Sequence, residues 1–242
     1  MPILPQVAMP FVRLLYQFWL ECNVSKHILD DILGMDITTE GKDKFGISSH
    51  KMAELHQAAV EQTKDPSLGV RLGQYIAKSN VIINDMLLKS ATLDVGLEAL
   101  ISHSKVISES GWFELTEIDE GSVRLCFSAG KEITFSSYQK DMVFSAVHAC
   151  FLSVFSDANK HIKYYFDVKN VSGVEHKKLL ECSIEAGNDT YIEISKSLLI
   201  RENPKADKIL FDQPSTKKAI SFIKKFKDPK KETSNKTKFY NK

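Results

Sequence analysis

Apolar residues recur at helical spacing through the first hundred residues, with polar residues and turn formers between the apolar stretches. Pro10 suits the first turn of one helix, and Asn23 is a suitable left-handed cap at its end. Gly34 is placed to end a second, shorter helix. The spacing predicts helices over residues 10–22, 25–33, 48–64 and 68–76, the third beginning at Ser48 or Ser49. A fifth helix is predicted to begin at Ser90 or Thr92 and to end at about residue 108, and the apolar stretch 81–88 is left of undecided type.

After Gly111 the apolar residues alternate with polar ones, which is typical of strands. A long stretch with helical spacing of apolar residues then separates the second and third of these predicted strands. The patterns predict strands over 112–115, 123–127, 163–168 and 190–194, and helices over 137–156, 174–182 and 216–226. This order predicts an α+β fold, in which a helical N-terminal half packs on a mostly antiparallel sheet crossed by a long helix.

The fourth predicted helix, which follows the turn at Asp65-Pro66, carries two glycines four residues apart, Gly69 and Gly73. Each glycine costs a helix about 1 kcal/mol relative to alanine, so a packing reason is expected. Residues at this spacing share one helix face, where glycine lets another backbone approach closely. Arg71 between them is expected to pair with a nearby carboxylate, either Asp65 or Glu61.

The charges are distributed unevenly along the chain, although the net charge is only +1. Residues 217–242 hold ten lysines against Asp228 and Glu232, a balance of +8, so residues 1–216 carry −7. A basic end of this kind is typical of a solvated, disordered tail, and it could also attract phosphates without reading their sequence.

The apolar runs and the cysteines indicate a cytoplasmic protein that does not enter a membrane. No apolar run reaches the roughly 18–20 residues that a membrane span needs. The four cysteines lie far apart in the sequence, and no two of them form a CxxC pair, which favours free thiols in a reducing compartment.

Motifs for metal, nucleotide or nucleophilic chemistry are missing from the sequence. The seven histidines include no HExxH pair, and no GxSxG, GxGxxG or Gly-Lys-Ser/Thr motif occurs. We therefore expect neither a metal nor a cofactor, and no enzymatic activity. The remaining possibility is a ligand pocket, in which a few polar groups stand on apolar walls.

Four residues are candidates for lining such a pocket. His103 and Ser104 interrupt an apolar helix face, His148 borders another, and Tyr138 begins the long helix. Each histidine equally fits the edge of the core, with its ring nitrogens satisfied by the protein.

Several motifs of the chain, taken in order, resemble a known family. They are Asp65-Pro66 at a helix end, the run from Gly69 to Gly73, Ser90-Ala91-Thr92-Leu93 at a helix start, and the closing segment Ile192–Asp207. The sequence resembles the N-terminal effector-binding and dimerisation domain of AraC-type transcription regulators, in the branch of the ornithine-utilisation regulators. The resemblance extends over roughly residues 8–210.

The resemblance implies a sensor domain over residues 1–214, followed by an amphipathic linker helix and a basic tail over 215–242. It also implies a homodimer and a small-molecule effector, either a metabolite or a fatty acid. Such regulators continue into two helix-turn-helix motifs that bind DNA, and no such region is found up to Lys242. The alternative is a stand-alone interaction protein that dimerises with, or titrates, a full-length regulator.

Overall fold

The computed structural model describes residues 6–37, 46–79, 82–104, 108–130, 133, 135–167 and 173–207. The chain divides into two units, and the elements below all belong to the first of them, Met1–Ala206. The predicted domain boundary at residue 214 and the predicted helix 216–226 lie outside the described residues.

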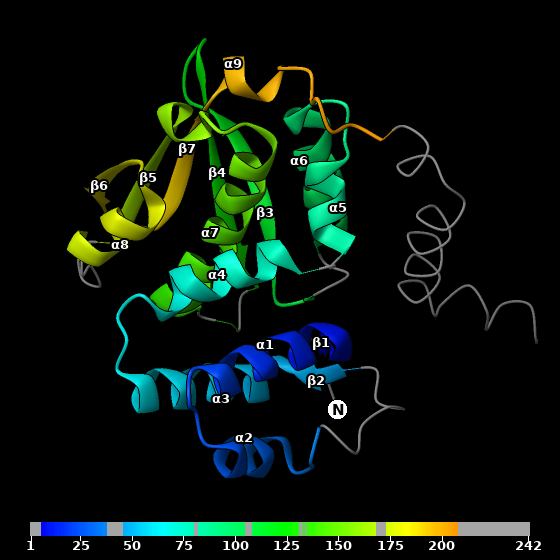
Figure 1. Cartoon of the computed structure of the whole chain (residues 1–242), viewed down its shortest axis with the longest axis vertical. Helices are drawn as coiled ribbons and strands as arrows, with labels where there is room; N and C mark the ends of the chain where they lie inside the picture. Colours follow the sequence, from blue (N-terminus) through cyan, green and yellow to red (C-terminus); the bar gives the residue numbers. More distant parts are fainter. Residues whose placement is uncertain are drawn as a thin grey trace, which may run out of the picture. The chain divides into compact units, whose positions relative to one another are not determined.

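The first part of the chain forms a layer of helices, drawn in blue and light blue in Figure 1. Its helices are α1 (Met9–Glu21), α2 (Lys26–Leu33) and α3 (Ser49–Thr63). As the sequence predicts, Asn23 and Gly34 adopt positive φ angles of 62° and 69° where α1 and α2 end. The sequence did not predict the two-stranded antiparallel sheet of β1 (Gln6–Ala8) and β2 (Gly46–Ser48), because strands of three residues are too short to show alternation.

Three further helices follow, α4 (Leu68–Lys78), α5 (Ile82–Leu88) and α6 (Leu93–His103). The apolar stretch of undecided type is therefore helical. The prediction that the next helix continues to Ser108 was wrong, because Ser108 instead forms an isolated antiparallel bridge with Val7 of β1. The backbone N–H of Ser108 still donates to the carbonyl of Ser104 at 3.4 Å, and that of the next residue, Glu109, donates to the carbonyl of Gln6 at 3.1 Å.

The second half of the unit is built on a five-stranded sheet with the order β3-β4-β7-β5-β6. Its strands are β3 (Gly111–Glu117), β4 (Ser122–Ala129), β5 (Ile162–Asp167), β6 (Ser183–Gly187) and β7 (Tyr191–Ser195). Only the β5–β6 pair is parallel, so the predicted α+β fold with a mostly antiparallel sheet is confirmed. Strand β6 was not predicted, because it is a largely exposed edge strand with no clear apolar face.

The long helix α7 (Ser137–Val154) crosses the sheet, with α8 (Gly173–Leu180) and α9 (Lys196–Leu199) as shorter additions. Among the described residues, no helix is both long enough and apolar enough to cross a membrane.

Two hydrophobic cores form within the unit, and helices α4 and α7 contribute to both of them. The first core fills the space inside the N-terminal layer and includes Trp19 and Leu55. The second lies between the sheet and the helices that cover it, and includes Leu125 and Phe144. Figure 1 shows α4 between the N-terminal layer and α7. The α4–α7 pair is therefore the structural link between the two cores.

Candidate functional site

A partly enclosed cavity of about 120 Å³ lies where the two cores meet. Its wall is mainly apolar and combines residues of the N-terminal layer with residues of the sheet and its helices. Val7 comes from β1, Met52 from α3, Leu100 from α6 and Met142 from α7. A single buried water needs only about 10–15 Å³ of such space, so the cavity has room for a small organic molecule.

Three phenylalanines form an aromatic wall on the sheet side of the cavity. The ring centroids of Phe113 and Phe127 lie 5.0 Å apart, and those of Phe127 and Phe135 also lie 5.0 Å apart. Gly111 makes this arrangement possible, because a Cβ at that position would lie 2.6 Å from the Phe135 ring and 2.8 Å from the Phe127 ring. The wall therefore offers flat apolar surface to a ligand.

Most polar groups that line the cavity already have partners within the protein. Asn84 donates from Nδ2 to the carbonyls of Ile76 (2.7 Å) and Ser79 (2.6 Å), which satisfies the end of α4. Ser104 donates to the carbonyl of Ile101 at 3.2 Å. The Ser49 and Ser110 hydroxyls are hydrogen-bonded to each other. Because these groups are occupied, they contribute little to the recognition of a ligand.

His56 and Gln139 differ from these groups. They are buried, with 6% and 7% of their surfaces exposed, and both line the cavity. Within the described part of the chain, neither ring nitrogen of His56 has a hydrogen-bond partner. The Nε2 amide of Gln139 has none either, whereas its Oε1 accepts from the backbone N–H of Ser136 at 3.0 Å. Among the buried side chains of the wall, these two thus keep hydrogen-bonding atoms that a ligand can engage.

The electrostatics of the cavity are those of an uncharged site. Burial lowers the pKa of His56 to about 4, so the imidazole is neutral at physiological pH and carries one donor and one acceptor nitrogen. Burial raises the pKa of the Cys150 thiol to about 12, so this lining residue also stays neutral. Among the described lining residues there is no aspartate, glutamate, lysine or arginine.

A second hollow, a groove of about 600 Å³, runs along the outside of α3 and the start of α7. It shares Ala53, His56 and Gln139 with the inner cavity. Ala53 is exposed, whereas the other two are buried, so the three residues form a boundary between solvent and the inner cavity. We call them the boundary residues.

The four candidate residues from the sequence fall in different places. Ser104 lines the cavity, and Tyr138 lines the outer groove. His103 is half-buried near the end of α6, with Nδ1 2.7 Å from the carbonyl oxygen of Ala99. His103 is not among the residues that line either hollow.

His148 is buried in the second core, on a side of α7 that does not line the cavity. Its Nε2 lies 2.7 Å from Oδ1 of Asn159, and its ring packs beside Tyr164. Burial lowers the pKa of His148 to about 4, although the hydrogen bond to Asn159 acts in the opposite direction. Among the described residues, no group of His, Cys, Asp and Glu could hold a metal ion.

The two glycines of α4 face α7 at very short range. A Cβ at Gly69 would lie 3.0 Å from Cβ of Asp141 and closer still to the carbonyl oxygen of Tyr138. A Cβ at Gly73 would lie 2.8 Å from the backbone nitrogen of Ala146, and it would overlap the Ser145 hydroxyl. The glycines therefore set the distance between the two helices that join the cores.

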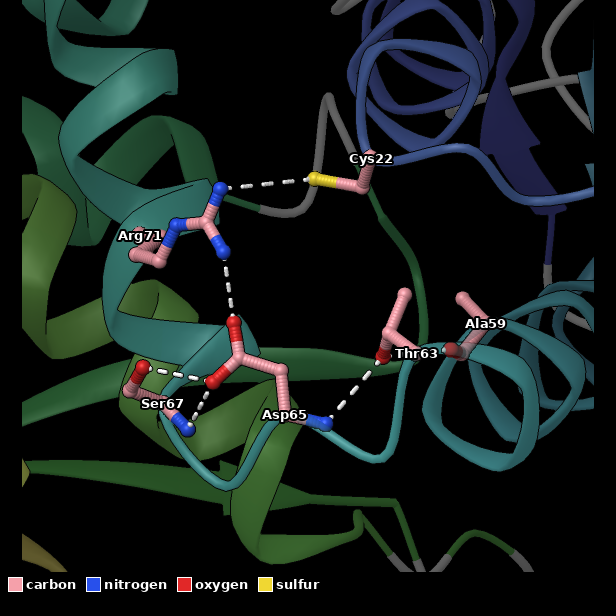
Figure 2. A network of polar contacts seen from close by, with 6 residues as sticks. All are labelled: Cys22, Ala59, Thr63, Asp65, Ser67 and Arg71. Carbon is pink, nitrogen blue, oxygen red and sulfur yellow. Dashed lines mark hydrogen bonds and ion pairs between the residues drawn. The ribbon is translucent and has the colours of Figure 1, made fainter.

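The turn before α4 is held by the polar network in Figure 2. Oδ1 of Asp65 accepts hydrogen bonds from the backbone N–H of Ser67 (2.8 Å) and from its hydroxyl (2.6 Å). Oδ2 of Asp65 pairs with Arg71 at 2.6 Å, and the Arg71 guanidinium also reaches Sγ of Cys22 at 3.8 Å. Asp65 thus fixes where the α3–α4 turn ends, and Arg71 links α4 to the end of α1.

His56 and Gln139 were not candidates from the sequence. The only signal for His56 is that it interrupts the apolar stripe of α3, four residues after Met52. Gln139 resembles an ordinary capping-box residue at the third position of a helix, and it also has that role, with Ser136 as its partner. Its position beside a cavity depends on contacts between distant segments.

Two comparisons with known proteins agree with this architecture. The family described as the N-terminal arabinose-binding domain of AraC transcription regulators matches residues 34–201. The crystal structure of the transcriptional regulator CdpR from Pseudomonas aeruginosa is similar, with a TM-score of 0.54 and 12% sequence identity. The alignment covers 81% of this chain and 64% of the CdpR chain, so this chain spans less than two thirds of its length. At this identity the likeness shows the fold alone. No curated protein matches in sequence.

Proposed function

Because the chain belongs to the family of N-terminal arabinose-binding domains of AraC transcription regulators, we propose that it senses a small-molecule effector bound in the inner cavity. The family is a regulatory ligand-binding domain of transcription regulators and not an enzyme family. The observation that carries the proposal is that two buried polar groups on the wall of an apolar cavity, the His56 ring and Nε2 of Gln139, lack hydrogen-bond partners among the described residues. Pockets for small molecules combine apolar walls with a few such groups.

The position of the cavity between the two cores suggests how effector binding can change the conformation of the rest of the protein. Its walls belong to both cores, and among the described elements only α4 and α7 contribute to both. An effector bound in the cavity favours the arrangement of the two cores in which both cavity walls contact it. Binding thus shifts the population between different arrangements of the two cores. We propose that this shift changes the geometry of a homodimer, and through it the DNA affinity of an attached helix-turn-helix module.

The outer groove offers a route by which the effector enters. The boundary residues Ala53, His56 and Gln139 are the residues that both hollows share. In this proposal the effector passes Ala53, the exposed member of the three, and then contacts the two buried side chains. Tyr138, on the wall of the groove, is proposed to contact the effector during entry.

A fluorescence and thermal-shift experiment tests the proposal. Trp19 packs edge-on against His56, with ring centroids 5.1 Å apart, so its emission should report on the cavity. In a Trp112→Phe background Trp19 is the only tryptophan. A library of metabolites and fatty acids should contain compounds that raise Tm and change Trp19 emission together.

Two matched substitutions locate the binding. Ala53→Phe narrows the boundary between the hollows and is expected to weaken binding of a hit compound at least tenfold. Ala58→Phe places the same side chain in the outer groove only, and is expected to leave binding almost unchanged. Equal affinities for the Ala53→Phe variant and the wild type would contradict binding in this cavity, as would a library without any hit.

A further inference from the structure

The chemistry of the inner cavity restricts what can bind there. A carboxylate or ammonium group placed in an apolar cavity needs a counter-charge, because burial removes its hydration. The described lining residues supply none. An anionic fatty acid or a charged amino acid therefore does not fit this wall.

A sugar fits the cavity no better, despite the name of the family. A pentose presents several hydroxyl groups, and each buried hydroxyl needs a hydrogen-bond partner. Most polar groups on the wall are already bonded within the protein, as for Asn84 and Ser104. The two free side chains cannot satisfy a full set of sugar hydroxyls.

The free groups define the polar part of the ligand. Oε1 of Gln139 is occupied by Ser136, so this side chain offers only its Nε2 donors. A donor calls for an acceptor on the ligand, such as a carbonyl oxygen. His56, as a neutral imidazole, can add one donor or accept one hydrogen bond. The phenylalanine wall and the methionines Met52 and Met142 suit a flat or flexible apolar body.

We propose that the inner cavity selects an uncharged, mainly apolar molecule that presents a carbonyl oxygen to Nε2 of Gln139 and packs its apolar body against Phe113, Phe127 and Phe135. This inference rests on the proposed sensing function and specifies the class of effector. His56 lies beside the carbonyl group and completes the polar end of the site. The aromatic wall holds the other end.

Matched probes separate the features of this ligand class. Acetophenone and 2-octanone are neutral and carry a carbonyl, benzoate and octanoate are their anionic counterparts, and ethylbenzene has no acceptor. L-arabinose represents the sugars. Binding is measured with the whole chain at pH 7.5, through Trp19 emission in the Trp112→Phe background and through the shift of Tm. Each ketone is expected to bind at least tenfold more tightly than its carboxylate, than ethylbenzene and than L-arabinose.

One substitution tests the donor directly. Gln139→Glu keeps an oxygen for the capping box, in which glutamate is a usual residue, but replaces the Nε2 donor with an acceptor. It is expected to weaken ketone binding at least tenfold. Ser136→Ala is the control for stability, because it removes the hydroxyl of the capping box and leaves Nε2 of Gln139 in place. This control is expected to lower Tm and to keep the affinity for ketones.

The outcomes distinguish this inference from the proposed function. Tighter binding of the carboxylates or of L-arabinose, lost in Ala53→Phe, would overturn the ligand class and leave sensing in this cavity intact. Equal binding of acetophenone and ethylbenzene, or unchanged ketone affinity in Gln139→Glu, would overturn the role of the donor. No response to any probe at millimolar concentration would overturn the inference and remove the support for sensing in this cavity.

Discussion

Ser145 of α7 donates a hydrogen bond to the backbone carbonyl of Val70 in α4, with 3.1 Å between the oxygens. This bond crosses directly between two helices at the level of Gly73, whose missing side chain leaves space for the Ser145 hydroxyl. Because α4 and α7 contribute to both cores, this contact holds together the two walls of the cavity.

Gly73→Ala is expected to destabilise the protein. Alanine favours the helix by about 1 kcal/mol, but overpacking at a tight contact costs about 1–3 kcal/mol. Here the new Cβ meets backbone atoms of Met142 and Ala146, which cannot rotate away, so the loss should lie at the upper end of that range. Chemical denaturation measures the free energy of unfolding.

The control for this change is Gly121→Ala in the β3–β4 turn. The nearest atom to a Cβ there is Oδ1 of Asp119 at 3.6 Å, an ordinary contact, and Gly121 does not have a positive φ angle. Its free energy of unfolding should remain within about 0.5 kcal/mol of the wild type. Similar losses for both variants would contradict the role of close helix packing.

Asp65→Ala is expected to cost about 1–2 kcal/mol, because it removes the acceptor for Ser67 that begins α4 and the partner of Arg71. Arg71→Ala should cost less than about 1 kcal/mol, since the guanidinium is about half exposed and the Ser67 bonds remain. Urea denaturation of the two variants and of the double variant tests this order. A larger loss for Arg71→Ala would show that the ion pair dominates the turn.

Acid is expected to destabilise the protein through two buried histidines. Burial lowers the pKa of His56 and of His148 to about 4, whereas a histidine in the unfolded chain titrates near its usual 6.5. The unfolded state therefore binds protons first as the pH falls. Stability should be fully present above pH 6.5 and decrease towards pH 4, by roughly 3 kcal/mol for each histidine.

Denaturation curves measured between pH 7.5 and 4 test this prediction. His56→Gln should reduce the histidine part of the pH dependence in that window by about half, since His148 then remains as the histidine whose pKa burial lowers to about 4. Stability that stays constant from pH 6.5 to pH 5 would show that neither histidine is held neutral by burial.

Asp141 and His176 form a buried pair between α7 and α8, with 3.2 Å between Oδ2 and Nε2. Burial raises the pKa of Asp141, while the hydrogen bond with His176 acts against that shift. Breaking a buried pair by removing one member is strongly destabilising, so Asp141→Ala should cost about 3–5 kcal/mol. Asp141→Asn keeps an acceptor for His176 and should cost clearly less.

A double-mutant cycle measures the coupling within this pair. The variant Asp141→Ala/His176→Phe should lose less stability than the two single changes together, by at least about 1 kcal/mol. Additive losses would mean that the pair contributes no coupling and that both side chains act through packing alone.

Local patterns predicted most of the fold. The apolar periods located α1 to α4, the β3–β4 hairpin and the long helix α7, because each signal depends on residues close in sequence. The end of α6 and the edge strand β6, which the local patterns did not predict, were decided by distant partners. Ser108 pairs with Val7, and β6 is a strand because it pairs in parallel with β5.

The site was much less accessible to sequence reasoning. Of the four candidate residues for the pocket, only Ser104 lines the inner cavity, and Tyr138 lines the outer groove. His103 and His148 have polar partners elsewhere in the protein, at Ala99 and Asn159. A helix period shows that a histidine interrupts an apolar face, but not whether another group satisfies it.

The sequence by itself determined most of the helices, the strands β3, β4, β5 and β7, the two glycines spaced for close packing, and the resemblance to AraC-type regulators. These depend on residues within one or two turns of each other, or on motifs in a fixed order. Only the tertiary structure decided that His56 and Gln139 line the same cavity, with the His56 ring and Nε2 of Gln139 left without hydrogen-bond partners among the described residues. They lie on α3 and α7, and burial and hydrogen-bond satisfaction are set by packing between such distant segments.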